Sequence, residues 1–450
     1  MLHSRRRWLL RRIELKKLFN LSLPLILAQL AQSSMGFVDT IVAGRVSAID
    51  LAAVAVGSSV WFPLLLLLLG ILSALTPTIS QAHGAGHHHM IRHTTPQGVY
   101  LGAIAGLLIT IILQHSSFIL PWLKADPALI PLIEGYLYGV SWGFPAIGVC
   151  FALRYCSEGL SLTRPSMVVS FFGLIVNIIA NYILVFGKCG FTAMGGVGCG
   201  PASAIAMWAM MLGMIVVFWR GHIYRNLDML RIINPWCWRT QKQLLKLGLP
   251  IGGGLFIECS IFAIIALLLA RFGAQSVAAH QIALNFTSMI FMIPLSIGTA
   301  ISVRVGYTIG RQRKNQLLRA TRCGITSAIT LALISCSVIL LFPLQCVSIY
   351  SNDPQLLTAA AALLFFAAIY QVPDAIQVSS AGALRGCKDT RTPMLIQTIA
   401  YWAIGLPIGC YLGLFLNWGA RGFWIGLICG LTSAAIMLLL RLHHILHRLA

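Results

Sequence analysis

Long apolar runs dominate this sequence and limit what it can fold into. Leu18 to Gly44, Leu51 to Ser80 and Gln355 to Leu384 are each longer than the roughly 20 apolar residues that a helix needs to cross a bilayer. Charged residues make up only 10% of the chain, whereas a soluble domain usually carries about 25%. The sequence therefore predicts an all-α polytopic membrane protein.

Twelve transmembrane helices are predicted when the whole chain is searched for such runs. The first is too long for a cleavable signal peptide, contains Asp39 and lacks a small-residue cleavage pattern after it, so we expect it to be retained. The predicted helices cover residues 18–44, 51–80, 95–122, 129–154, 165–187, 201–219, 243–270, 276–305, 318–346, 355–384, 393–416 and 419–441.

The basic residues predict the orientation of these helices. The net charge is +21, but the basic residues form short tracts between apolar segments, which argues against a nucleic-acid partner. Of the 32 Lys and Arg, those in the odd-numbered connections are only Arg45, Lys124, Lys188, Arg271 and Arg421. By the positive-inside rule, both termini are cytoplasmic, and we expect a multi-pass protein of the bacterial inner membrane.

The two halves of the chain resemble each other. Leu21-Ser22-Leu23-Pro24 matches Leu247-Gly248-Leu249-Pro250 at an offset of 226, and Pro145 matches Pro373 at an offset of 228. Six helices per repeat is an even number, so the repeats are parallel. Parallel repeats predict two six-helix lobes around a central cavity.

The predicted domain organisation follows from the repeat and from the long polar connection near the middle of the chain. We expect a basic cytoplasmic tail at 1–17, an N-lobe at 18–219, a cytoplasmic interlobe linker at 220–242, a C-lobe at 243–441 and a cytoplasmic tail at 442–450.

Three of the eleven acidic residues, Asp39, Glu258 and Asp374, fall inside apolar spans. An ionised carboxylate there costs roughly 2.5 to 3.5 kcal/mol, so such groups are usually functional. A structural role, with each acid protonated or paired, is the alternative. The repeat favours function, because the architecture places no acid at the equivalent positions, which are Ile265, Gln32 and Ala146.

Polar neighbours at helical spacing strengthen this interpretation. Tyr370 lies one turn before Asp374, and Asn177 and Asn181 lie one turn apart on the fifth span. Their oxygens could complete a sodium shell; packing and interhelical hydrogen bonds are the alternatives. A carboxylate that binds a proton, a sodium ion and a cationic substrate in turn supports exchange transport. Pro373 and Pro145 can each kink their helix, either as a hinge beside the acid or as an ordinary bend without a function.

No other ligand is expected from the motifs. The sequence has no paired C-x-x-C, no Walker A motif and no G-x-G-x-x-G, so we expect no nucleotide, no cofactor and no metal other than sodium, at Glu258, Asp374 and Tyr370. Cys189 and Cys199 lie in one short loop that we place outside, which makes a disulfide between them one alternative.

Several segments resemble the NorM-like branch of the multidrug and toxic compound extrusion family, across essentially the whole chain. They are Phe37-Val38-Asp39-Thr40, the run Asp50 to Gly57, His83-Gly84-Ala85-Gly86, Glu258, and Tyr370-Gln371 to Asp374 with Gly382 to Gly386. The resemblance implies two six-helix lobes and cation-coupled export of organic cations such as drugs and dyes. It also implies that the coupling or substrate-binding residues are Asp39, Glu258, Asp374, Tyr370, Asn177 and Asn181.

Relatives in this family often have an acid at the position of Asn181, so the amide leaves the coupling ion, sodium or proton, open. We expect a monomer that contacts membrane lipid. A lipid-linked oligosaccharide flippase is the alternative function, but it would require Arg or Lys along the cavity, and the spans carry almost none. An enzyme is not expected, because no catalytic motif lies within a span.

Overall fold

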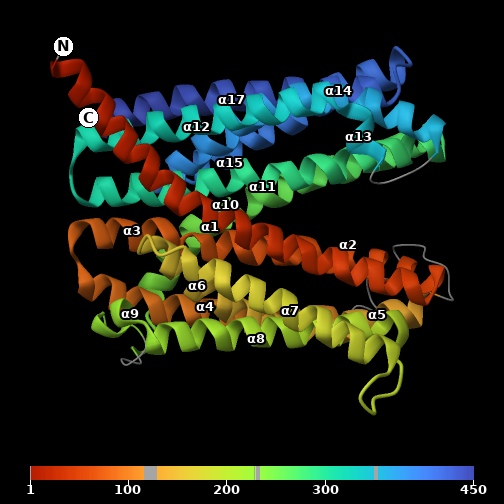
Figure 1. Ribbon diagram of the computed structural model, residues 1–450. Helices are drawn as coiled ribbons and strands as arrows, with labels where there is room; N and C mark the ends of the chain where they lie inside the picture. Colours follow the sequence, from red (N-terminus) through yellow and green to blue (C-terminus); the bar gives the residue numbers. More distant parts are fainter. Residues whose placement is uncertain (1, 116–128, 228, 230–233, 349–352, 450) are drawn as a thin grey trace. The chain divides into compact units, whose positions relative to one another are not determined.

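The computed structural model describes residues 2–115, 129–227, 229, 234–348 and 353–449, and in this part the chain is all-α (Figure 1). Among the described residues, eleven helices are long and apolar enough to span a membrane, and the count is twelve when the bent pair α5 (Ile130–Ser141) and α6 (Phe144–Gly159) is taken as one span. The predicted fold class and number of spans are confirmed. The predicted end of the third span at residue 122, and Lys124, lie outside the described residues.

The chain divides into two compact units. The N-unit is Pro24–Gly252, and the C-unit is Met1–Leu23 together with Gly253–Ala450. The chain thus passes from one unit to the other inside two helices, α1 (Leu2–Val46) and α10 (Trp238–Leu269). The predicted lobes begin at residues 18 and 243, whereas the compact units change between residues 23 and 24 and between residues 252 and 253.

Both predicted tails are helical in the described residues. α1 begins at Leu2, and α17 (Ala420–Leu449) continues through residues 442–449. Neither segment contains a Gly or Pro that would end a helix, so each span continues beyond the apolar run.

The N-unit consists of helices around one apolar core. Within it, α4 packs on α6, and α7 packs on α8. Besides α5, α6 and its parts of α1 and α10, its elements are α2 (Ala48–Ser73), α3 (Leu75–Ala85), α4 (His88–Gln114), α7 (Arg164–Phe186), η3 (Gly195–Gly198), α8 (Cys199–Arg220) and α9 (His222–Asn226).

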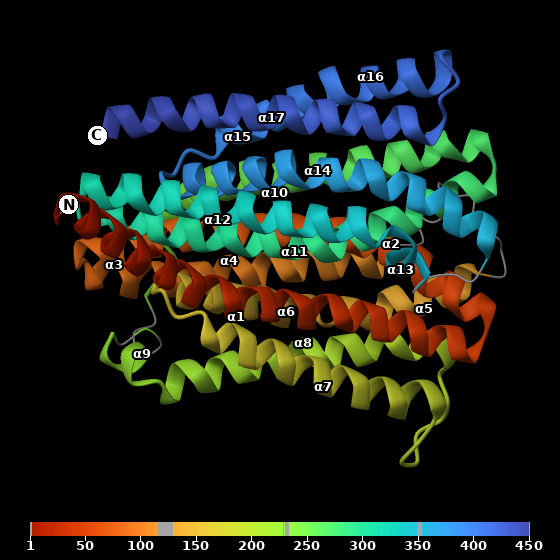
Figure 2. The same ribbon diagram turned by 45° about the horizontal axis from the view of Figure 1, so that its top comes forward.

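In the C-unit, α14 is the central helix and packs against α11, α12 and α17 (Figure 2). This position makes α14 the most enclosed helix of the unit. Besides α17 and its parts of α1 and α10, the elements are η4 (Ala270–Phe272), α11 (Ala274–Gly310), α12 (Lys314–Leu341), α13 (Pro343–Ser348), α14 (Pro354–Gly386), α15 (Arg391–Thr398), η5 (Ile399–Gly405), α16 (Leu406–Cys410) and η6 (Tyr411–Phe415).

The same close helix contact occurs in both units: its facing residues, Thr76 with Ile79 and Ser302 with Val305, match at the offset of 226, and its glycines, Gly159 and Gly386, lie 227 positions apart. A Cβ added to Gly159 would lie 3.0 Å from the Thr76 carbonyl oxygen, and one added to Gly386 would lie 2.8 Å from the Ser302 carbonyl oxygen. Gly159 also faces Ile79, as Gly386 faces the equivalent residue of the C-unit, Val305. The repeat therefore extends from the sequence to the packing of α3 on α6 and of α11 on α14.

The two predicted kinks have different outcomes. α5 and α6 are bent by 43° just before Pro145, which has no N–H to donate to the Ser141 carbonyl. α14 instead runs unbroken through Pro373. The eleventh span is less regular than predicted, because η5 and η6 are π-helical.

Candidate functional site

Asp39 of α1 lies at the centre of a hydrogen-bonded cluster in the N-unit. Asn181 Nδ2 and Asn177 Nδ2 donate to its Oδ1 at 2.7 Å and 3.2 Å, and Ser203 Oγ donates to its Oδ2 at 2.6 Å. Asp39 is only 4% exposed. The structure thus brings together three residues singled out in the sequence, Asp39, Asn177 and Asn181, and adds Ser203.

Helices α7 and α8 position these donors. Asn177 and Asn181 are one turn apart on α7, and Asn181 Nδ2 also donates to the Asn177 carbonyl at 3.0 Å. Ser203 lies one turn after Cys199 on α8, and the Cys199 thiol donates to the Asp39 carbonyl at 3.7 Å. Sequence reasoning missed Ser203; its one-turn spacing from Cys199 was the only signal available.

Three donors to one buried carboxylate stabilise its ionised form and so offset the cost of burying it. The Oδ1 atoms of Asn177 and Asn181 accept no hydrogen bond from any described residue. In the observed orientation, the side-chain nitrogens of Asn177 and Asn181 donate to Asp39, and this arrangement is compatible with a carboxylate that takes up and releases a proton. Rotating them would turn oxygens toward the same point, and oxygens are the ligands that hard cations such as sodium require.

A second acidic cluster lies in the C-unit, on α10 and α14. Asp374 is completely buried, and neither carboxylate oxygen has a hydrogen-bond partner among the described residues. The charge of Glu258, which is half-buried, acts on Asp374 and on the hydroxyl of Tyr370. The structure therefore brings together Glu258, Asp374 and Tyr370, as the sequence indicated.

Tyr401 is a further member of the C-unit cluster that the sequence analysis missed. Its side chain is 3% exposed, its hydroxyl has no partner in the described part of the chain, and the charges of both Glu258 and Asp374 act on it. Tyr401 belongs to the π-helical η5, a kind of segment that is often found at functional sites.

Two neighbouring acids repel each other when both are ionised, and Asp374 has no hydrogen-bond donor among the described residues to offset this. A proton shared between them, or a sodium ion held by the carboxylates with the hydroxyl of Tyr370, would remove this repulsion. The donor set consists of hard oxygens, which fits sodium. Arg385 adds a positive charge that acts on Glu258.

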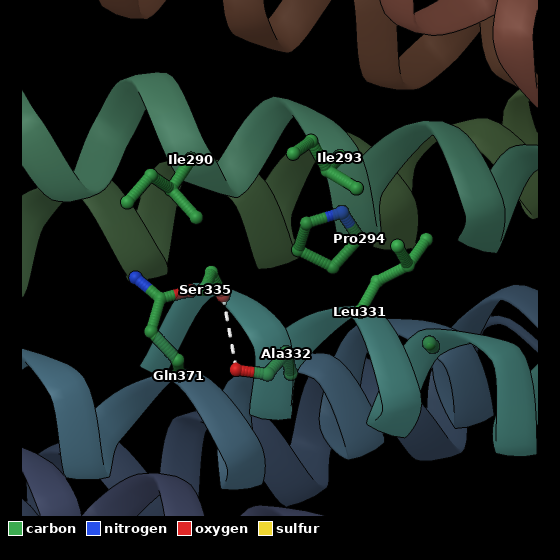
Figure 3. Close-up of a pocket in the computed structure, with 8 residues that line it drawn as sticks. Ile290, Ile293, Pro294, Leu331, Ala332, Ser335 and Gln371 are labelled. Carbon is green, nitrogen blue, oxygen red and sulfur yellow. Dashed lines mark hydrogen bonds between the residues drawn. The ribbon is translucent and has the colours of Figure 1, made fainter. Parts of the chain in front are cut away.

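A small, mainly apolar pocket lies between α11, α12 and α14 (Figure 3). Its wall is formed by Ile290, Ile293 and Pro294 of α11 and by Leu331 of α12, and α14 contributes Gln371. Gln371 is 1% exposed, its Nε2 has no partner in the described residues, and it precedes Asp374 by three positions. The pocket thus offers apolar surface with one free amide donor.

The disulfide that the sequence left open as an alternative is not formed in the structure. Cys189 and Cys199 are both free cysteines. Cys189 is exposed in the loop after α7, whereas Cys199 is buried at the start of α8 with its thiol directed at the Asp39 carbonyl. Two cysteines in one short loop can thus point apart, because the length of a loop does not determine where its side chains point.

Comparisons with known proteins agree with the division of the sites between two halves. The profile of the MatE family matches twice, at residues 24–183 and 250–411. The first matched segment contains Asp39, Asn177 and Asn181, and the second contains Glu258, Asp374 and Tyr370.

Curated relatives match over nearly the whole length. The probable multidrug resistance protein NorM of Shewanella oneidensis is 45% identical and covers 96% of this chain and 95% of its own. Multidrug resistance protein NorM of Vibrio vulnificus is 42% identical, with 97% of this chain and 96% of its own covered. Multidrug resistance protein MdtK of Yersinia pestis is 41% identical and covers 96% of this chain and 95% of its own.

Solved structures show the same fold. The eukaryotic MATE transporter AtDTX14 superimposes with a TM-score of 0.87 at 17% identity and covers 98% of this chain and 100% of its own. A MATE protein in complex with MaD3S gives a TM-score of 0.88 at 20% identity, with 97% of each chain covered.

Proposed function

The chain belongs to the multidrug and toxic compound extrusion family, and on this premise we propose that it exports organic cations in exchange for inward-moving protons or sodium ions. The protein is a multidrug efflux transporter of the bacterial inner membrane and not an enzyme. The proposal concerns the coupling ion, the charge of the substrate and the residues that bind them.

The observation that carries the proposal is the state of Asp374. Its carboxylate is completely buried, both oxygens lack a hydrogen-bond donor in the described part of the chain, and a second acid, Glu258, acts on it. A buried charge without a partner is strongly destabilising. A cation that binds and leaves in each cycle provides the missing partner.

Exchange requires that the coupling cation and the substrate favour different states of the protein, because a ligand with equal affinity for two states shifts neither. Competition for the same carboxylates meets this requirement. The Asp39 cluster supplies a second such site.

The buried arginines argue against an anionic lipid-linked substrate. Arg154 Nε donates to Glu158 Oε1 at 2.7 Å, and Arg304 Nε donates to Glu14 Oε1 at 2.8 Å. Each of these positive charges is neutralised by a carboxylate of its own unit. A flippase for anionic headgroups would need such charges to be available to its substrate.

We further propose that both termini lie in the cytoplasm and that the protein transports as a monomer. The basic first and last helical segments, which include Arg11, Arg12 and Arg448, support the orientation.

The test is efflux of a cationic dye from proteoliposomes with an imposed sodium or proton gradient. Wild-type efflux is expected to follow one of the gradients. We expect Asp39→Asn, Glu258→Gln and Asp374→Asn to slow it, at least two of them by about 10-fold or more, which corresponds to about 1.4 kcal/mol in the transport barrier.

Glu134→Gln is the matched control, because it neutralises an acid of α5 that belongs to neither cluster. It should export like the wild type. If all three cluster variants also exported at the wild-type rate, the carboxylates would be structural and the proposal would fail.

A further inference from the structure

Four buried polar residues follow one another on α14 at intervals of three positions. They are Gln371, Asp374, Gln377 and Ser380, and each is at most 1% exposed. Residues three positions apart are neighbours on the surface of a helix, so the four form one continuous polar ridge. Gln371 and Asp374 belong to the site described above, whereas Gln377 and Ser380 have no part in it.

The ridge carries polar atoms that nothing in the described part of the chain satisfies. Both amide atoms of Gln377, the Ser380 hydroxyl and Gln371 Nε2 have no hydrogen-bond partner there. Ser379 shows the contrast, because its hydroxyl donates to the Ile376 carbonyl at 3.2 Å. Buried polar groups nearly always have a partner, and internal water provides it where protein groups do not.

The fold itself does not require polar side chains on this ridge. The offset of 228 that matches Pro145 with Pro373 places only apolar residues at the four equivalent positions of the first half: Gly143, Ala146, Val149 and Ala152. The offset of 227 that matches Gly159 with Gly386 also places only apolar residues there. A buried polar atom without a partner costs free energy. The polar residues of α14 therefore indicate a function rather than packing.

The ridge begins at a pocket and leads past Asp374 toward the end of α14. Gln371 lines the pocket between α11, α12 and α14 (Figure 3). Gln377 and Ser380 lie on the other side of Asp374, toward Gly386, where the helix ends. In the proposed orientation, that end of α14 is cytoplasmic.

Amides and hydroxyls both donate and accept hydrogen bonds without carrying a charge. They can bind water, and a cation that moves with it, without holding the cation as firmly as a carboxylate does. We propose that Gln377 and Ser380 bind internal water and form the route by which the coupling cation moves between Asp374 and the cytoplasmic end of α14. The inference rests on the proposed function, because it requires that Asp374 binds the coupling cation.

Arg385, in the last turn of α14, agrees with release at this end. Its positive charge acts on Glu258. A positive charge here opposes a cation that stays, and a conducting route must bind its ion weakly enough to let it leave.

Dye efflux from proteoliposomes, under the gradient that drives the wild type, tests the route. Gln377→Leu and Ser380→Ala replace unpartnered polar groups by apolar ones, so the variants should fold as the wild type does. A cation that loses a hydrogen bond on its path moves about 10-fold more slowly. We therefore expect the double variant to slow efflux by about 10-fold or more.

Ser379→Ala is the matched control. Ser379 is the adjacent residue on the same helix and is as buried as Ser380, but its hydroxyl already has a partner. This variant should export like the wild type. Equal slowing in Ser379→Ala, or wild-type efflux in the double variant, would overturn the proposal.

Equilibrium binding separates a route from a binding site. In the double variant, the coupling ion should still raise the Kd of tetraphenylphosphonium as it does in the wild type, because the carboxylates are intact. Loss of that ion dependence would place Gln377 and Ser380 in the binding site and would overturn the route. If neither ion drives efflux or changes the Kd in the wild type, the proposed function fails, and the route with it. If the wild type meets both expectations and the double variant exports normally, only the route fails.

Hydration of the ridge can be measured without transport. In radiolytic hydroxyl labelling of the purified full-length protein, water bound next to a buried side chain makes that side chain reactive. Val378 is only 4% exposed and lies between Gln377 and Ser379. Peptide mass spectrometry should find Val378 labelled in the wild type and in Ser379→Ala, and less labelled in the double variant. An unlabelled Val378 in the wild type would contradict internal water at the ridge.

Discussion

Asp39 and Asp374 are both buried carboxylates in membrane spans, but their surroundings differ. Asp39 accepts hydrogen bonds from Asn177, Asn181 and Ser203, whereas Asp374 accepts none from the described residues and has Glu258 as its neighbour. Donors stabilise a carboxylate in its ionised form, whereas a neighbouring acid makes it depend on a bound cation. The two clusters are therefore not equivalent binding sites, and we expect each to respond differently to mutation.

At the residue scale, the hydrogen bond from Ser203 to Asp39 is expected to contribute to stability. Ser203→Ala leaves a buried carboxylate oxygen without its donor, which costs about 1.5 to 3 kcal/mol. Ser170→Ala on α7 is the control, because the Ser170 hydroxyl is equally buried but has no partner in the described chain. Thermal unfolding of the purified protein should show a lower Tm for Ser203→Ala alone; an equal Tm for both variants would show that the bond contributes nothing.

The sequence could predict those site residues that lie one turn apart on the same helix. Asn177 with Asn181, and Tyr370 with Asp374, share helix faces, so periodicity indicated that each pair acts together. Ser203 and Tyr401 join their clusters from other helices, and serine and tyrosine are too common in membrane spans to stand out. The pairing of helices, which no periodicity encodes, was needed to find them.

At the scale of the helices, the same close packing contact occurs in both units. Gly159 and Gly386 occupy equivalent places and allow backbone to approach backbone. The sequence matched the two halves by short motifs, but it did not indicate which glycines lie between helices. It also predicted a regular eleventh span, since no residue pattern marks the π-helical segments η5 and η6.

Gly159→Ala and Gly386→Ala should each destabilise the protein by about 1 to 3 kcal/mol, the usual effect of overpacking. Each new Cβ would lie within 2.8 Å of a Cβ on the facing helix, Ile79 or Val305. Gly36→Ala is the control, because nothing lies within 4 Å of its added Cβ. The thermal unfolding midpoint measures all three; a drop as large in Gly36→Ala would remove the packing explanation.

At the scale of the whole molecule, the chain changes unit inside helices rather than in loops. The changes occur at Leu23 and Pro24 in α1 and at Gly252 and Gly253 in α10, two residues after Pro250. The repeat makes Pro24 and Pro250 equivalent. The part of α1 before Pro24 belongs to the C-unit, and the part of α10 through Gly252 belongs to the N-unit, so each unit contains the first part of the other half's first helix. Polar composition indicated a linker at 220–242, but composition does not show which unit a helix end packs against.

The predicted orientation can be tested through Cys189, an exposed thiol in a loop that we place outside. A membrane-impermeant maleimide should label Cys189 in intact spheroplasts. Cys387, which follows α14, should be labelled only in inside-out vesicles. Peptide mass spectrometry identifies the labelled thiol, and Cys189→Ser is the control. The reverse pattern would place both termini outside the cytoplasm.

The central claim is that buried carboxylates bind the coupling cation in competition with the substrate. Equilibrium binding of tetraphenylphosphonium to the purified protein, measured over a range of sodium concentrations and of pH, tests it most directly. We predict that sodium or protons raise the Kd of the wild type in proportion to their concentration. The dependence of the Kd on that ion should disappear when the cluster that binds the ion is neutralised, by Asp374→Asn or Glu258→Gln in the C-unit or by Asp39→Asn in the N-unit. A Kd that neither ion changes in the wild type would contradict the account.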